Sequence, residues 1–134
     1  MDLSVYDTAK TADGGAVLEV RHPGTGAKLK GVRITLLGAD SPRWRAAQAE
    51  KVNRRLSEAS AGRRAANIED ADEDAIELLA AATIKWEGVE LDGKALECST
   101  ENACVLYRRL PWLREQADRF IADRANFLPA LSKT

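Results

Sequence analysis

The stretch Val32-Arg33-Ile34-Thr35-Leu36-Leu37-Gly38-Ala39-Asp40-Ser41-Pro42 decides the fold, because its pattern changes from that of a strand to that of a helix. Residues 32–37 alternate between apolar and polar side chains, which is typical of a strand with one buried face, and Gly38 ends the run. Ser41 then provides a helix N-cap, and Pro42 occupies the first helical position, where a missing N–H is tolerated. The chain therefore passes from a β region into a helical region near residue 40.

A second alternating run, Ala16-Val17-Leu18-Glu19-Val20-Arg21-His22, lies upstream of the first. The turn-forming sequence Pro23-Gly24-Thr25-Gly26 follows it. We expect the two runs to pair as an antiparallel hairpin with a long loop and one face packed inward. Residues 1–40 are thus predicted to be a β-hairpin region, and residues 41–134 to be mainly helical.

Two helices are expected in the first part of the helical region. The first begins at Ser41 and carries apolar residues at close to helical spacing on one face. These residues are Trp44, Ala47, Val52, Leu56 and Ala59. Residues 60–67 are the best candidate for a connector. The second helix begins near Glu69 with acidic first turns that suit the helix dipole, and its small side chains predict close packing on a neighbour.

An extended segment separates the second helix from the third. Residues 84–91 have strand character, and Asp92-Gly93 is a tight-turn signal directly after them. Ser99 is expected to cap a helix over Thr100 to Arg109, which Pro111 ends while opening a fourth helix. The fourth helix is predicted to carry one apolar stripe, made of Leu113, Ala117, Phe120, Ile121, Phe127 and Leu128.

These patterns together predict an α+β fold with an N-terminal antiparallel β-hairpin, about four α-helices and a short extended segment near Trp86. The length of 134 residues, with 45% hydrophobic and 31% charged residues, indicates one globular domain over residues 1–134. The N-terminus lacks the pattern of a secretory signal, and no apolar run approaches the roughly 20 residues that span a bilayer. We therefore expect a cytoplasmic protein that does not bind membranes.

No residue pattern typical of an enzyme is found, and we expect neither a cofactor nor a metal. The single histidine, His22, stands in a loop without a nucleophile close to it in sequence. The glycines of residues 23–28 lack the spacing of a phosphate-binding loop, and the acidic residues 70–74 lack the glycine and glutamate of a calcium loop. Cys98 and Cys104 are expected to be reduced, partly buried thiols.

Opposite charges are concentrated in neighbouring segments of the chain. Residues 41–64 carry seven basic side chains against two acidic ones, whereas residues 69–77 carry six acidic side chains and no basic one. The basic helix could grip phosphates, but the acidic run could neutralise it, and no base-reading motif accompanies it. We therefore expect no nucleic-acid binding, and instead a dipolar surface that complements a protein partner or a second copy of the chain.

Several strand, turn and helix signatures occur together in two stretches that cover more than half of the chain. The first stretch comprises residues 18–26 and 32–41, and the second residues 86–94, 98–103, 106–107, 111–116 and 120–127. Both stretches resemble the tail assembly chaperones of long-tailed bacteriophages of the siphophage type. Thr100 departs from the proline expected at the first helical position, which alters the cap slightly.

The resemblance implies a chaperone that binds the tape measure protein, keeps it soluble and helps recruit the major tail protein during tail tube assembly. Such a chaperone acts in the host cytoplasm and is absent from the mature virion. Relatives are commonly made in a short form and a longer frameshifted form, and an end just after the last helix favours the short form. A structural virion component of the tail or neck, or a small phage protein that inhibits a host complex, remains as an alternative.

Candidate partner-binding residues lie on the first and fourth helices. The stripe of the fourth helix, beside the second helix, could form an apolar groove with a charged rim for an amphipathic helix, or could be ordinary core. Trp44 and Trp86 are expected in the core, whereas Trp112 opens a helix, where one side could stay exposed and anchor a partner. The candidates are Trp112, Arg45, Arg54, Arg55, Leu113, Phe120 and Phe127. Association into a homo-oligomer is a further expectation.

Overall fold

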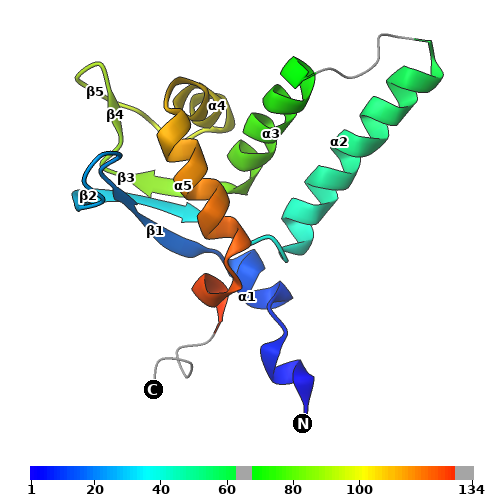
Figure 1. Ribbon diagram of the computed structural model, residues 1–134, viewed down its shortest axis with the longest axis horizontal. Helices are drawn as coiled ribbons and strands as arrows, with labels where there is room; N and C mark the ends of the chain where they lie inside the picture. The colour runs from blue at the N-terminus through cyan, green and yellow to red at the C-terminus, as the bar shows by residue number, and fades with distance from the viewer. Residues whose placement is uncertain (63–67, 129–134) are drawn as a thin grey trace.

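The computed structural model describes residues 1–62 and 68–128 and has an α+β architecture (Figure 1). Strands β1 (Ala16–Arg21) and β2 (Lys28–Leu36) form the antiparallel hairpin that the sequence predicts. Strand β3 (Thr83–Glu87) pairs antiparallel with the other side of β2, so the sheet has the order β1-β2-β3. The extended segment near Trp86 is therefore part of the same sheet as the hairpin.

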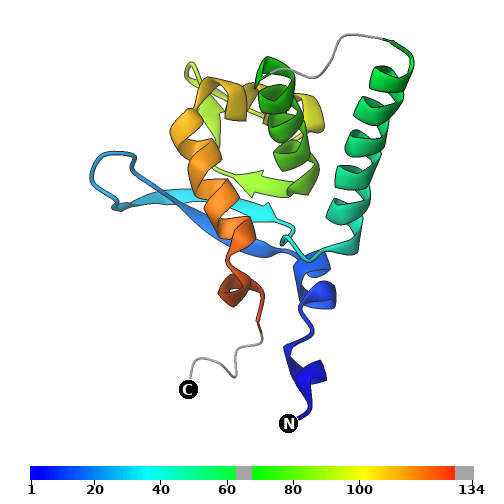
Figure 2. The same cartoon turned by 45° about the vertical axis from the view of Figure 1, so that its right-hand side comes forward.

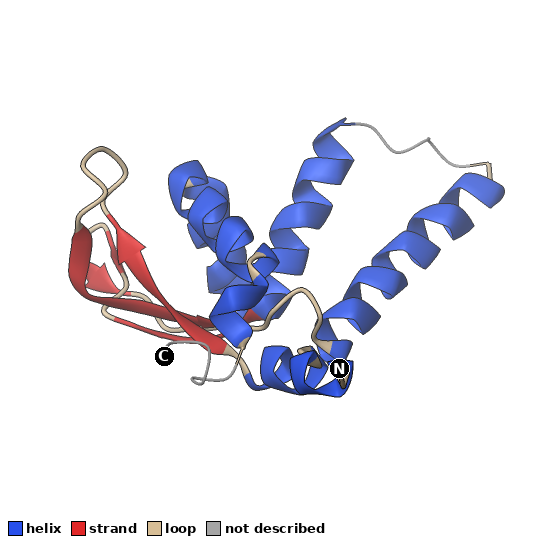
Figure 3. Cartoon of the chain, turned by 60° about the horizontal axis from the view of Figure 1, so that its bottom comes forward, coloured by secondary structure: helices blue, strands red, loops and turns tan. Residues whose placement is uncertain are grey.

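Helices account for most of the remaining described chain. The α-helices are α1 (Ala9–Gly14), α2 (Pro42–Ser60), α3 (Ile68–Ala82), α4 (Thr100–Arg109) and α5 (Pro111–Ala122). Short 3-10 helices η1 (Leu3–Tyr6) and η2 (Arg124–Phe127) lie near the two ends, and a two-stranded ribbon is formed by β4 (Glu90–Leu91) and β5 (Lys94–Ala95). Helices α3, α4 and α5 cover one face of the sheet, whereas α2 stands to one side (Figures 2 and 3).

The caps predicted at two helix starts are present. The Ser41 hydroxyl accepts a hydrogen bond from the main-chain N–H of Trp44 at 3.3 Å, and the Ser99 hydroxyl accepts one from Asn102 at 3.1 Å. Ser41 is fully buried, and its hydroxyl also donates to the Asp13 carboxylate at 2.5 Å. This second bond fixes the start of α2 against α1, a helix that the sequence patterns did not reveal.

Two predicted helix ends differ from the structure. Helix α5 ends at Ala122 instead of continuing towards residue 128, because the Asp123 carboxylate accepts a hydrogen bond from the main-chain N–H of Ala125 at 3.0 Å and starts η2. Helix α2 continues to Ser60, so the predicted connector begins later, and its residues 63–67 lie outside the described residues.

The hydrophobic core lies between the sheet and helices α3, α4 and α5. Its fully buried side chains include Tyr107, Ile34, Leu36, Leu79 and Leu106. The Tyr107 hydroxyl forms a hydrogen bond with the Thr83 hydroxyl at 2.7 Å, which satisfies both groups, and burial raises the pKa of Tyr107. This hydrogen bond joins the start of β3, at Thr83, to α4, which contains Tyr107.

Trp44 and Trp86 are partly buried and pack against this core. The indole N–H of Trp44 donates to the main-chain oxygen of Leu78 at 3.0 Å, and that of Trp86 donates to Leu96 at 2.7 Å. Each tryptophan therefore fills space with its ring and satisfies its polar edge on a neighbouring element. The expected core role of both residues is confirmed, with partial burial.

Candidate partner-binding site

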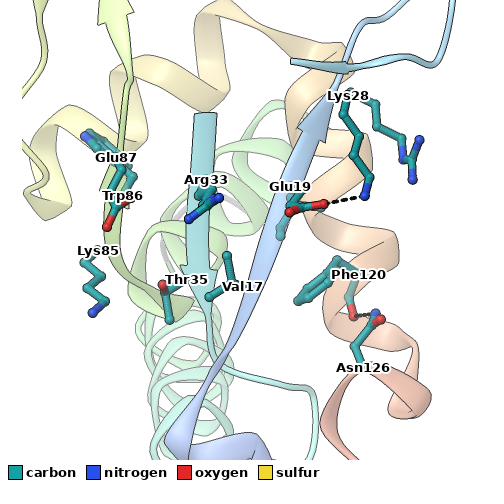
Figure 4. Close-up of a pocket in the computed structure, with 12 residues that line it drawn as sticks. Val17, Glu19, Lys28, Arg33, Thr35, Lys85, Trp86, Glu87, Phe120 and Asn126 are labelled. Carbon is teal, nitrogen blue, oxygen red and sulfur yellow. Dashed lines mark hydrogen bonds and ion pairs between the residues drawn. The ribbon is translucent and has the colours of Figure 1, made fainter. Parts of the chain in front are cut away.

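Two hollows adjoin on the surface where α5 runs beside the outer edge of β1. One has a volume of about 700 Å³ and lies over the open face of the sheet (Figure 4), and the other, of about 580 Å³, lies between α5 and the β1–β2 loop. Their shared lining residues make them one feature, which we call the β1–α5 groove. The shared residues are Leu18, Arg21, Phe120 and Asn126.

Helix α5 presents different stripes to the core and to the groove. Leu113, Ala117 and Ile121 recur every four residues and are buried, with 0% to 5% of each residue exposed. One residue earlier, Trp112, Gln116 and Phe120 recur with the same spacing and line the groove. Because residues four apart share a helix face, the two stripes are adjacent faces of one helix.

Among the aromatic and aliphatic candidates, the structure brings Trp112 and Phe120 together in the groove. Both are only partly buried and pack against the core from its edge. Leu113 and Phe127, by contrast, are 3% and 4% exposed and belong to the core. The Phe127 ring packs edge-on against Phe120 with their centroids 5.7 Å apart, so it supports the groove from beneath.

The edge of β1 is partly open within the groove. The Gln116 side chain donates to the main-chain oxygen of Arg21 at 2.7 Å and accepts from its N–H at 3.0 Å, as a neighbouring strand would. Main-chain groups alternate sides along a strand, so those of Val17 and Glu19 point to the same edge. In the described part of the chain no hydrogen bond to these outward groups is formed. An extended peptide could therefore pair with them.

Charged side chains surround the aromatic part of the groove. Glu19 and Lys28 form an ion pair at 2.8 Å, and the hydrogen bond from Lys28 lowers the pKa of Glu19 (Figure 4). Further charges on both sides come from Arg33, Lys85, Glu87, Glu115 and Arg119. An apolar floor with a mixed charged rim is the composition of many protein-binding surfaces.

His22 shapes the loop at one end of the groove. Its ring Nδ1 accepts hydrogen bonds from the main-chain N–H groups of Gly24 at 2.9 Å and Thr25 at 3.1 Å. Nδ1 is therefore the acceptor, which places the proton of the neutral ring on Nε2. The role of His22 is therefore structural: its two hydrogen bonds hold the loop between β1 and β2 in its conformation.

Ion pairs between helices neutralise much of the charge contrast seen in the sequence. Arg55 forms two hydrogen bonds to the Asp74 carboxylate, at 2.8 and 2.9 Å, and Lys51 forms an ion pair with Glu77. The acidic residues of α3 also bind arginines of α4 and α5, because Glu73 pairs with Arg108 and Asp72 pairs with Arg114 at 2.6 Å. Helix α3 is thus the acidic centre that holds three other helices.

The three arginine candidates differ in availability. Arg55 is occupied by Asp74 and, at 3.2 Å, by Glu58, and the Asp74 bonds raise the pKa of Arg55 while lowering that of Asp74. Arg45 and Arg54 are exposed on α2, away from the β1–α5 groove, and Arg45 donates to the Ala39 main-chain oxygen at 3.3 Å. The basic candidates therefore do not form one patch with the aromatic ones.

Residues 1–62 and 68–128 contain neither a metal-binding cluster nor a membrane-spanning helix. No group of three or more His, Cys, Asp or Glu side chains in these ranges is placed to hold a metal ion, and no helix there combines the length and apolarity needed to cross a bilayer. Cys98 and Cys104 are free and partly buried, as expected, and burial raises the pKa of both thiols.

The chain matches no protein-family model, no curated protein and no solved structure. Of the residues that line the groove, the sequence patterns singled out Trp112 and Phe120 but not Gln116 or the open edge of β1. The four-residue spacing of Trp112, Gln116 and Phe120 was the available signal for Gln116. The open edge of β1 could not be predicted from the sequence, because it depends on which strand lies at the side of the sheet.

Proposed function

We propose that the protein is a tail assembly chaperone of a long-tailed bacteriophage, which binds the tape measure protein in the host cytoplasm. In this role it also helps to recruit the major tail protein during tail tube assembly and leaves before the virion is complete. The observation that carries the proposal is the β1–α5 groove, in which Trp112 and Phe120 stand beside an open strand edge inside a charged rim. The resemblance of both sequence stretches to this family supports the same conclusion.

The groove suits temporary binding of an aggregation-prone partner. Tryptophan and arginine are frequent among the residues that dominate binding energy, and the groove offers Trp112 with Arg21 and Arg119 nearby. An apolar face of a tape measure segment would cover Trp112 and Phe120, while the rim charges stay in contact with water. Such a contact shields apolar surface of the partner without a large permanent interface, which fits a chaperone that later dissociates.

A structural component of the tail or neck is the second candidate, and one observation favours it. The N-terminal segment exposes Leu3 at 71%, Val5 at 62% and Tyr6 at 57%, all within or beside η1. A permanent neighbour in a virion would cover these apolar side chains. Mass spectrometry of purified virions separates the candidates, because a chaperone is expected to be absent and a tail component present in fixed copy number.

Co-expression with the tape measure protein of the same phage tests the proposed chaperone function. We expect the tape measure protein to be insoluble alone, and to become soluble and co-purify when this chain is present. If the chain is found in virions and has no effect on tape measure solubility, the structural alternative replaces the proposal. Where the gene also encodes a longer frameshifted form, as relatives of this family commonly do, that form should be tested in parallel, so that a requirement for it is recognised.

A further inference from the structure

Helix α2 turns its charged side towards its own domain and its apolar side outwards. The five side chains that are partly covered along the helix recur at helical spacing and face α3: Trp44, Ala47, Lys51, Arg55 and Glu58. The described α2 has no buried residue at all, and Val52 and Leu56 are 54% and 60% exposed. Helical spacing predicts Trp44, Val52 and Leu56 on one face, but of these three only Trp44 packs against the core.

The exposed apolar residues form a regular seam. Ala49, Val52, Leu56 and Ala59 are separated by three, four and three residues, which is the spacing of a helix that packs against another helix. At 100° per residue the seam lies roughly 120° around the helix axis from the side that faces α3. A shallow hollow lined by Arg45, Gln48, Ala49, Val52 and Asn53 lies at its N-terminal half. Figures 1 and 3 show α2 projecting beside the other helices.

We propose that this seam binds α2 of a second copy of the chain, in antiparallel orientation. An antiparallel pair centred between Val52 and Asn53 places the large Leu56 of each copy opposite the small Ala49 of the other. Large and small side chains then interdigitate, as close packing between helices requires. A parallel pair would place Leu56 against Leu56 and Ala49 against Ala49, which leaves one layer crowded and the other empty.

The charges near the seam favour the same arrangement. In an antiparallel pair, Arg45 of one copy lies beside Ala59 and Ser60 of the other, where its aliphatic stem can cover the small side chains. In a parallel pair the two copies of Arg45 would face each other and repel. Of the side chains that flank the seam, Gln48, Asn53 and Ser60 are uncharged, and Arg55 is already bound by Asp74 and Glu58. Two copies can therefore approach without bringing unpaired like charges together at these positions. The seams of two copies are thus complementary when the two helices run antiparallel.

The inferred dimer does not depend on the proposed chaperone function, because it uses α2 and leaves the β1–α5 groove open. Four turns of paired helix cover less area than the roughly 1,600 Å² of a standard interface. We therefore expect a weak, concentration-dependent dimer. If the chain acts as the proposed chaperone, such a dimer presents two grooves to one long partner, and two linked sites bind a repetitive partner more tightly than one.

Sedimentation velocity of the full chain over a range of concentrations tests the existence of the interface. The wild type is expected to pass from monomer to dimer, and Leu56→Glu to weaken dimerisation at least about tenfold while circular dichroism remains unchanged. Val105→Glu, at a position on α4 that is 44% exposed, is the matched control and should leave dimerisation intact. A wild type that stays monomeric, or a Leu56→Glu variant that dimerises normally, would overturn the proposal.

Disulfide cross-linking tests the orientation. In a background with Cys98→Ser and Cys104→Ser, Ala49→Cys chains and Leu56→Cys chains are oxidised separately and as a mixture. The antiparallel pair predicts a cross-linked dimer only in the mixture. Cross-linking of either variant with itself would show a parallel pair, and cross-linking in none of the samples would place the contact elsewhere. Each of these outcomes contradicts the proposed arrangement.

Discussion

Asp40 ties both ends of the described chain to the start of the helical region. Its carboxylate accepts hydrogen bonds from the Arg124 guanidinium at 2.7 and 2.9 Å and from the Thr8 hydroxyl. Arg124 belongs to η2 and Thr8 precedes α1, so one side chain connects three segments that are far apart in sequence. The Arg124 bonds, followed by the Thr8 bond, lower the pKa of Asp40 to about 2.

This pKa gives a pH-dependent prediction for Asp40→Asn. A carboxylate with a lowered folded-state pKa stabilises the fold above its ordinary pKa of 3.8, and the contribution is lost as pH falls towards 2. Because Arg124 is largely exposed, we expect the substitution to reduce stability by only about 1 kcal/mol at pH 7. The difference between wild type and variant in urea unfolding should shrink below pH 4. A constant difference from pH 7 to pH 2 would contradict this explanation.

Gly88 is the residue whose backbone is most constrained. It has φ of +71°, and a Cβ atom added there would clash with the main-chain oxygen of Gly31. Gly88→Ala is expected to destabilise the protein by about 3 kcal/mol, because the unfavourable backbone angle and the backbone clash add. Gly93→Ala is the matched control: φ is +79° but no atom lies within 4 Å, so only about 1 kcal/mol should be lost in chemical unfolding. Equal losses would show that the clash is relieved.

At the scale of secondary-structure elements, the features that could be predicted are those that depend on local sequence. The caps at Ser41 and Ser99 and the alternation in the hairpin depend on neighbouring residues, and the structure contains all of them. The pairing of β3 with β2 depends on contacts between residues about fifty positions apart, so the alternating pattern showed an extended segment without its place. The groove was missed for the same reason, since it requires the order of the strands.

Helix α2 is the element whose orientation the apolar periodicity predicted least well. Its apolar spacing predicted an amphipathic helix, but not which side faces the domain. Ion pairs with α3 determine that side, because Lys51 pairs with Glu77 and Arg55 pairs with Asp74. The apolar seam of α2 therefore faces solvent. Apolar periodicity in a single sequence does not reveal this orientation, because ion pairs and not apolar contacts hold α2 to α3.

The N-terminal cap of α2 provides a prediction at this scale. Ser41→Ala removes a cap that is fully buried and that also donates to Asp13. We expect a loss of about 2 kcal/mol in the free energy of unfolding, at the upper end for helix caps. Ser99→Ala removes a cap on an exposed residue and should cost about 1 kcal/mol. If both substitutions cost the same, the bond between Ser41 and Asp13 adds nothing to the stability.

At the scale of the whole molecule, the two proposed binding surfaces are separate. The β1–α5 groove lies beside the sheet edge and is formed by two elements that pack on the main core. The α2 seam lies on the helix that stands apart from the helices over the sheet (Figure 2). Because the two surfaces share no residue, substitutions in one are expected to leave the other working.

The most direct test of the proposed groove is the amount of tape measure protein that co-purifies with groove variants of this chain. We predict that Trp112→Ala and Arg119→Glu each reduce it several-fold, with thermal melting showing that the variants remain folded. Val105→Ala, which shortens an exposed apolar side chain outside the groove, should match the wild type. If both groove variants retain wild-type amounts of tape measure protein, the β1–α5 groove is not the binding site.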